Sequence, residues 1–383
     1  MALHFDAAEF EARRTHVLEE MARRRLDALL LFAPESHYWL TGYDTFGYCF
    51  FQCMVLTRAG EFTLLTRSAD LRQARHTSLV KSIVIWNDQA GAGPAVQLRE
   101  LLNDLGLLGN RIGIEYETHG LTAANGRAVD EALRAFATLE DASNLVPALR
   151  AVKSPAELAY VERAAALADD ALDAGLSVIR TGADEGEILA AMQGAVFAGG
   201  GDYPGNPFVI GSGEDALLCR TKSGRRRLES QDQITLEFAG TYRLYHVALM
   251  RTVLVGEPSA RHRELHAACV EALAECEAVM RPGTTFGEVF DAHARVMDEH
   301  SVTKHRLNAC GYSLGARYAP SWMDWPMFYR DNPAVIAPDM VLFAHMILMD
   351  SDAGAAMCLG RTYRTTEGAP VPLSRHGTEL LVR

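Results

Sequence analysis

One predicted hairpin carries two side chains that can take part in acid–base chemistry. Residues 234–256 form two β-rich runs joined by a short Gly-containing turn, with Glu237 in the first run and His246 in the second. A carboxylate can pair with a cationic group, and a histidine titrates near neutral pH. His246 follows Tyr245, so these two side chains point to opposite faces of a sheet. A structural carboxylate bonded to tyrosine hydroxyls, and a histidine packed under helices, are the alternatives.

Three residues outside the hairpin add to this chemistry. His345 is the best further candidate for a general base or acid, and Tyr312 is a candidate donor of a hydrogen bond or a proton. Arg220 cannot act as a base, but its planar guanidinium can hold a carboxylate at two points. We therefore expect a small zwitterionic substrate, with its cation at Glu237 and its carboxylate at Arg220. A core histidine, a buried tyrosine and a surface arginine are the alternatives.

Length and composition limit the classes of protein to consider. A chain of 383 residues exceeds what one hydrophobic core usually supports, so two domains are expected. The net charge of −12 argues against binding to nucleic acid, which uses clustered Lys and Arg. We find no signal peptide and no apolar run of about 18 residues, so we expect a cytoplasmic protein that does not enter a membrane. Seven cysteines without a CxxC pair argue against a disulfide framework or a zinc knuckle.

The first half of the chain alternates helical and strand patterns, which is typical of an α/β layer. Ser154, Pro155 and Glu157 then indicate a helix start, because Ser can cap a helix whose first turn holds Pro and an acid. We place the domain boundary there, which gives domains at 1–151 and 152–383. The expected helices are 7–25, 95–105, 156–178, 184–197 and 260–280, and the expected strands of the first half are 26–32, 53–57, 62–65 and 111–115.

Three segments of the second half, 237–252, 311–315 and 343–346, resemble the metal-binding segments of the pita-bread family of methionine aminopeptidase, aminopeptidase P, prolidase and creatinase. The resemblance covers the whole chain and implies an α/β N-terminal creatinase-type domain followed by an α+β pita-bread C-terminal domain. Divalent metals in such sites need several anionic oxygens, and one Glu with one His cannot bridge two ions. We therefore expect no metal and no other cofactor. The family's five ligand positions are filled here by Glu237, Ala248, Tyr312, His345 and Leu359 or Gly360.

Further segments resemble the metal-free branch of this family, which contains ectoine hydrolase and creatinase. Both relatives place a histidine eight residues after the Ser of a Ser-Gly pair, where this chain has Arg220. Ectoine hydrolase also has Glu where Gly360 falls and Ser where Met250 falls. These departures imply that proton transfer relies on other residues or that the reaction differs. The segments are 41–44 with 52–53, 200–204, 237–246, and 310–315 followed by Trp322.

The same resemblance suggests which residues line the substrate pocket. It implies that His246 faces the pocket, and in related dimers a loop like 42–49 lines the site of the partner subunit. We therefore expect a homodimer whose N-terminal domain closes the partner's site. Core packing of the aromatic residues, a buried thiol and a purely structural loop are the alternatives. The expected lining residues are Asp202, Tyr203, Tyr242, Cys310 and Trp322, with Tyr43, Asp44 and Phe46 from the loop.

The sequence predicts a metal-independent hydrolase that cleaves a C–N bond in a small zwitterion of the amidine or guanidine type. Such a reaction needs a base to activate water, a negative charge beside the cationic carbon and an acid for the departing nitrogen. Glu237, His345, His246 and Tyr312 are the predicted catalytic residues. Ring closure or elimination on a similar zwitterion, and a non-catalytic relative that binds a metabolite, are the alternatives.

Overall fold

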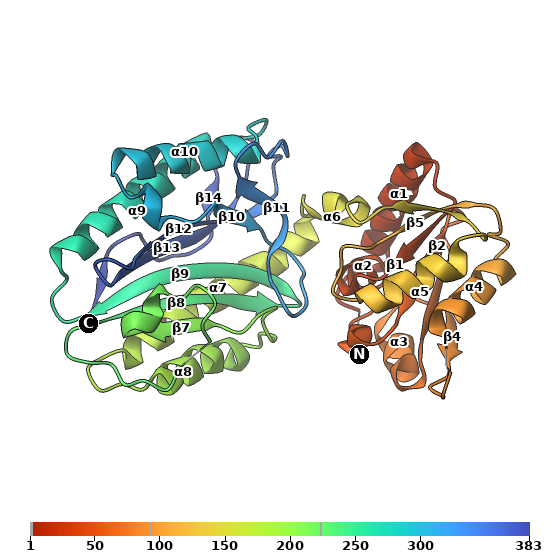
Figure 1. Ribbon diagram of the computed structural model, residues 1–383, viewed down its shortest axis with the longest axis horizontal. Helices are drawn as coiled ribbons and strands as arrows, with labels where there is room; N and C mark the ends of the chain where they lie inside the picture. Colours follow the sequence, from red (N-terminus) through yellow and green to blue (C-terminus); the bar gives the residue numbers. More distant parts are fainter. Residues whose placement is uncertain (1–2, 92, 223) are drawn as a thin grey trace. The chain divides into compact units, whose positions relative to one another are not determined.

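The computed structural model describes residues 3–91, 93–222 and 224–383, which form two compact units, Met1–Arg150 and Ala151–Arg383. Each unit is built on its own β-sheet (Figure 1). In the described part of the chain, no helix is both long enough and apolar enough to cross a membrane. The predicted catalytic residues all lie in the second unit.

The first unit is a six-stranded sheet of order β4-β3-β2-β1-β5-β6, in which β2 runs antiparallel to both of its neighbours. The predicted helices at 7–25 and 95–105 and the four predicted strands are confirmed within a few residues. The strands are β1 (Ala28–Leu31), β2 (Cys53–Thr57), β3 (Phe62–Arg67), β4 (Ser82–Trp86), β5 (Arg111–Ile114) and β6 (Thr138–Asp141). The helices are α1 (Ala7–Arg24), α2 (Pro34–Thr41), α3 (Leu71–Thr77), α4 (Pro94–Asp104), α5 (Ala123–Leu133) and α6 (Leu145–Arg150).

Helices cover both faces of this sheet, because alternate side chains of each strand enter different cores. Leu30 of β1 packs with residues of α4 and α5, whereas Leu29 and Leu31 pack with residues of α1, α2 and α6. Burial on both faces explains why the central strand reads as a continuous apolar run. The first unit is thus a three-layer α/β structure, as predicted.

The second unit is a nine-stranded sheet whose main path runs β11-β10-β12-β13-β9-β8-β7 within the described residues. Long antiparallel hairpins form most of it. The strands are β7 (Val209–Ser212), β8 (Asp232–Tyr242), β9 (Tyr245–Val255), β10 (Ala309–Ser313), β11 (Asp324–Tyr329), β12 (Val341–Asp350), β13 (Ala355–Arg364), β14 (Val371–Pro372) and β15 (Leu381–Val382). The helices are α7 (Pro155–Val178), α8 (Glu185–Ala198), α9 (Ala260–Val279) and α10 (Phe286–Glu299).

The predicted helix start at Ser154 is confirmed as a capping box. The Ser154 hydroxyl accepts a hydrogen bond from the Glu157 N–H, and the Glu157 carboxylate accepts one from the Ser154 N–H. Glu157 also accepts a hydrogen bond from the hydroxyl of Tyr245 at 2.5 Å. The cap therefore fixes the start of α7 and ties this helix to the first residue of β9.

The predicted hairpin is confirmed, but its turn is not the Gly-containing segment that the sequence indicated. Arg243 and Leu244 form the turn with φ values of 48° and 68°, which is the geometry of a tight two-residue hairpin. Gly240 lies inside β8, where a Cβ atom would come within 2.1 Å of the Ala164 carbonyl oxygen of α7. Close packing of the helix on the strand, rather than the turn, therefore requires this glycine.

The helices cover one face of the second sheet. Gly240 and Tyr245 face α7, and Ala344 and Leu359 lie in the core formed with α9 and α10. Because successive side chains of a strand alternate between the two faces, Glu237, which is three residues before Gly240, points to the other face. We call this the helix-free face because the described α-helices do not cover it, although the 3-10 helix Gly213–Leu217 packs on it through a hydrogen bond from Thr235 to Ala216. The candidate site lies on this face.

Candidate functional site

The strand register aligns four positions across the middle of the sheet, which we call the central row. Glu237 on β8 pairs with Met250 on β9, Met250 pairs with Gly360 on β13, and Gly360 pairs with His345 on β12. Directly paired residues of antiparallel strands share a face, so the row lies on the helix-free face. Tyr312 on β10 lies on the same face, because it pairs with the residue two positions before His345.

A hydrogen-bond chain connects three of the predicted site residues. The Trp322 indole N–H donates to the Tyr312 hydroxyl at 2.9 Å, and this hydroxyl donates to Glu237 Oε1 at 3.3 Å. Burial raises the pKa of Glu237, while the Tyr312 hydrogen bond and the charge of Arg220 oppose this rise. Burial and the nearby Glu237 also raise the pKa of Tyr312, so its phenol keeps its proton at neutral pH.

His345 lies beside this chain. Its ring centroid is 5.6 Å from that of Tyr312 and 5.5 Å from that of Phe343. Burial lowers the pKa of His345 to about 4, so the imidazole is neutral at pH 7. Among the described residues, its Nδ1 atom has no hydrogen-bond partner although the side chain is only 7% exposed. A buried, neutral and unpaired ring nitrogen is suited to accept a proton from water or substrate.

Arg220 places a positive charge near these groups. It is an exposed residue of the segment between β7 and β8, and its charge lowers the pKa of Glu237, Tyr312 and His345. Burial and Glu237 raise the pKa of the adjacent Cys219, so this thiol is not activated as a nucleophile. The charge of Arg220 is thus close enough to act on Glu237, Tyr312 and His345.

His246 shares the helix-free face, but the backbone occupies both of its ring nitrogens. Nε2 accepts a hydrogen bond from the Gly205 N–H at 2.8 Å, and Nδ1 lies 3.3 Å from the Gly315 carbonyl oxygen. Burial lowers the pKa of His246 to about 4. A neutral ring with its proton on Nδ1 satisfies both contacts. The geometry therefore favours the alternative of a structural histidine.

Two predicted lining residues lie on the wrong side of the sheet. Tyr242 is five residues from Glu237 and therefore faces α7, where its ring packs against Tyr160 at 5.7 Å. Cys310 lies in the core with Cys276 of α9. The pairing of β10 with β11 shifts register between Ala309 and Tyr312, which breaks the alternation of side chains. Tyr242 and Cys310 therefore lie on the helix side of the sheet, contrary to their predicted place in the substrate pocket.

The remaining lining candidates lie at the edge of the second unit. Trp322 is buried and belongs to the hydrogen-bond chain. Asp202 accepts a hydrogen bond from the Leu244 N–H at 3.3 Å and so supports the hairpin turn. Tyr203 is 82% exposed and packs edge-on against Phe197 of α8.

The loop residues of the first unit differ greatly in exposure. Tyr43 is buried in a core of that unit and stacks on His37, so its side chain is not displayed for a ligand. The Asp44 carbonyl oxygen accepts a hydrogen bond from Gln73. Phe46 is 82% exposed, so its side chain is the most accessible of the three predicted loop residues.

The central row does not provide the ligands of a two-metal centre. The described residues contain no group of three or more His, Cys, Asp or Glu side chains arranged to hold a metal ion. At Gly360, a Cβ atom would lie 2.6 Å from the Phe343 ring and 2.8 Å from the Met250 Cβ. Apolar side chains thus fill the space that a longer residue at position 360 would need. Sequence reasoning missed this role of Phe343, although its position two residues before His345 placed it on the same face.

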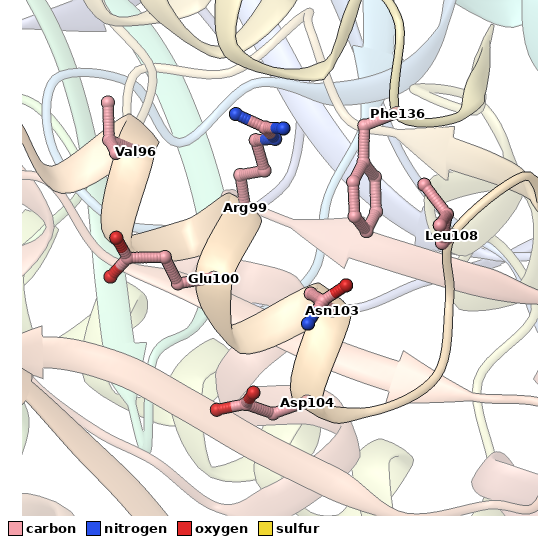
Figure 2. Close-up of a pocket in the computed structure, with 7 residues that line it drawn as sticks. All are labelled: Val96, Arg99, Glu100, Asn103, Asp104, Leu108 and Phe136. Atoms are coloured by element: carbon pink, nitrogen blue, oxygen red, sulfur yellow. The ribbon is translucent and has the colours of Figure 1, made fainter.

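Two surface pockets in the described residues lie away from this row. One, of about 390 Å³, lies in the first unit between α4 and the residues following α5, where Arg99 and Phe136 line it (Figure 2). The other, of about 460 Å³, is lined by Gln233, Asp232 and His262 at the end of the β8–β9 hairpin. Neither pocket is lined by Glu237 or His345.

Comparison with known proteins establishes the family. Residues 159–367, more than half of the chain, match the model of metallopeptidase family M24. The chain belongs to this family. Residues 13–152 match the creatinase/prolidase N-terminal domain, which agrees with the α/β first unit. This M24 protein therefore has the predicted creatinase-type and pita-bread domains.

Relatives of this M24 protein are hydrolases with different reactions. Ectoine hydrolase of Halomonas elongata is 27% identical over 366 residues, which cover 90% of each chain. Xaa-Pro dipeptidase of Pyrococcus furiosus is 23% identical over 55% of this chain. Prolidase from Thermococcus sibiricus superposes with a TM-score of 0.88 at 15% identity, covering 98% of this chain and 99% of the other. The last likeness shows the fold, and the first two place the chain among hydrolases.

Proposed function

We propose that this M24 protein is a metal-independent hydrolase that cleaves a C–N bond in a small zwitterion of the amidine or guanidine type. The observation that carries the proposal is the Trp322–Tyr312–Glu237 hydrogen-bond chain beside a neutral His345. The donor set supports metal independence, because one carboxylate and one imidazole do not suffice for two ions. The 27% identity to an ectoine hydrolase supports a non-peptide substrate.

In the proposed reaction, Glu237 binds the substrate, and His345 and Tyr312 transfer protons. The Glu237 carboxylate binds the cationic amidine, and pairing with this cation favours the ionised form of Glu237. His345 takes a proton from water while the water oxygen attacks the amidine carbon. The Tyr312 phenol gives its proton to the departing nitrogen, and the His345 imidazolium returns a proton to Tyr312. The C–N bond breaks as the added hydroxyl oxygen becomes the carbonyl oxygen, and the proton of this hydroxyl leaves on the amine product. One water molecule has then been added.

The product mass tests this proposal. Incubation with ectoine, creatine and linear amidines, followed by mass spectrometry, is expected to give products whose combined mass exceeds that of the substrate by one water molecule. Cyclic ectoine should give one heavier product, and a linear substrate should give two fragments. A chelator in excess is expected to leave the rate unchanged, because no step requires a metal. Loss of activity on chelation, with recovery on adding a divalent metal, would contradict metal independence. Products whose combined mass equals that of the substrate would identify elimination or rearrangement instead.

A substitution at Arg220 tests the proposed carboxylate contact. Arg220→Ala is expected to raise KM for a carboxylate-bearing substrate by about 10-fold to 100-fold, because a charged hydrogen bond is lost. Steady-state kinetics measures this change. Lys222→Ala is the matched control, since Lys222 is an exposed cation of the same loop. An equal rise of KM in both variants would mean that only the general charge of the loop matters.

We also propose a homodimer in the cytoplasm, in which the loop around Phe46 meets a second copy of the chain. The exposed Phe46 ring supports this, because large apolar side chains gather at protein interfaces. Light scattering tests the mass of the assembly, and a monomer would refute this part of the proposal.

A further inference from the structure

A narrow seam divides the sheet of the second unit into the two halves of the candidate site. The β8–β9 ladder contains eleven residue pairs and the β12–β13 ladder contains ten. Between them, β9 and β13 share two pairs, Arg251 with Leu359 and Met250 with Gly360. Glu237 lies on one side of this seam, and His345 with Tyr312 lies on the other. The relative position of the catalytic groups therefore depends on the seam.

Side chains reinforce the seam beyond its two ladder pairs. The Thr252 hydroxyl accepts a hydrogen bond from the Cys358 N–H at 2.8 Å, and the Thr362 hydroxyl donates to the Ala248 carbonyl oxygen at 2.7 Å. Each bond crosses from β9 to β13, one on either side of the paired residues. Arg251 supplies the bond in the middle.

Arg251 joins the two backbone positions at the centre of the row. Its Nη1 atom donates to the carbonyl oxygens of Met250 at 2.8 Å and Gly360 at 2.6 Å. Its Nη2 atom donates to the Gly377 carbonyl oxygen at 2.9 Å, in the segment after β14. Met250 pairs with Glu237, and Gly360 pairs with His345, so one guanidinium holds both halves of the row.

The environment of Arg251 is unusual for a charged side chain. It is 2% exposed on the helix side of the sheet, and the charges of Glu379 and Asp169 act on it although neither described carboxylate forms an ion pair with it. Burial lowers the pKa of Arg251 to about 10. A buried cation that has no carboxylate in direct contact is costly, and a similar apolar side chain could fill the same volume. The guanidinium is stabilised by its hydrogen bonds to the carbonyl oxygens of Met250, Gly360 and Gly377.

We propose that Arg251 is a positioning residue that fixes the separation between Glu237 and the Tyr312–His345 pair by clamping β9 to β13. The inference rests on the proposed function of the central row. Arg251 itself touches no substrate, because its side chain lies on the opposite face. Its effect on the reaction passes through the hydrogen bond from Tyr312 to Glu237, which spans the seam.

Arg361 provides a matched control. It neighbours Gly360 on β13 and, like Arg251, donates to carbonyl oxygens of the C-terminal segment, at Ser374 (3.5 Å) and His376 (3.2 Å). No hydrogen bond of Arg361 reaches β9 in the described residues. Loss of Arg361 therefore loosens the same C-terminal segment without removing the clamp.

The indole N–H of Trp322 reports on the seam without any substrate, because it donates to Tyr312, which in turn binds Glu237 across the seam. In Arg251→Met, we expect its resonance to shift and its hydrogen exchange to become at least about tenfold faster. The indole signals of Trp39 and Trp86, in the other unit, should not move. In Arg361→Met, the Trp322 signal should match that of the unchanged protein. Arg251→Lys, which offers a point charge rather than a fork, should give an intermediate shift.

An unchanged Trp322 signal in Arg251→Met, or an equal change in Arg361→Met, would overturn the inference. If Arg251→Met does not fold, Arg251→Lys decides with the same signal. Where turnover is measured, we expect kcat to fall at least about tenfold in Arg251→Met with a smaller change in KM. Absence of turnover in all variants would count against the proposed function alone, because the Trp322 signal requires no reaction.

Discussion

Glu237→Gln is expected to lower kcat/KM by about 10²-fold to 10³-fold, the scale on which removal of one preorganised electrostatic contact acts. Glu237 is the carboxylate of the central row, and glutamine keeps its size and an acceptor for Tyr312 but not its charge. The charge that the cationic carbon requires is therefore lost. Steady-state kinetics on the substrate found by mass spectrometry measures the effect. Glu214→Gln, at an exposed glutamate beside β7, is the control that should keep full activity.

The same substitution has a predictable effect on stability. Burial raises the folded-state pKa of Glu237 above its ordinary value of 4.5, so the folded protein binds its proton more tightly than the unfolded chain. Stability from this group is therefore full below pH 4.5 and falls as pH rises through the folded pKa. Glu237→Gln removes the cost of the buried charge, so its Tm should exceed that of the unchanged protein at alkaline pH. The difference should vanish below pH 4.5. A lower Tm at alkaline pH, or activity within tenfold of the original, would contradict the assigned role.

Local patterns predicted the scaffold of the site because they depend on neighbouring residues. The capping box at Ser154 and Glu157 needs only a four-residue segment, and the β8–β9 hairpin shows in the composition of its two runs. The face of Tyr242 was also predictable, because five residues separate it from Glu237 and an odd spacing reverses the face of a strand.

Other features depend on contacts between distant segments. The nitrogens of His246 bind Gly205 and Gly315, which lie in two different loops, so the sequence cannot show that this ring is occupied. Cys310 points into the core and not to the face of Tyr312, because the pairing of β10 with β11 shifts register between Ala309 and Tyr312. The Phe343 ring over Gly360 follows from the register of β12 and β13, which no local pattern fixes.

His345→Ala is expected to lower kcat by about 10²-fold to 10⁴-fold, the usual contribution of a positioned general base. The variant loses the packing of a buried ring on Tyr312 and Phe343 but, in the described residues, no hydrogen bond at Nδ1, so its Tm should fall less than that of a variant that leaves backbone groups unpaired. Single-turnover and steady-state kinetics measure the first effect, and calorimetry measures the second. The unchanged protein should also lose activity as pH falls towards the pKa of about 4, where His345 gains a proton.

His246→Ala is the matched control, because burial lowers the pKa of both histidines to about 4. In the unfolded chain each histidine has a pKa near 6.5, so each lowers the free energy of unfolding as pH falls from 6.5 towards 4. Each Ala variant removes the contribution of one histidine to this pH dependence. Acid stability therefore cannot separate the two roles. Kinetics can, since His246→Ala leaves the Gly205 N–H and the Gly315 carbonyl oxygen unpaired and should mainly lower Tm. The reverse pattern, with kcat lost at His246 and kept at His345, would move the general base to His246.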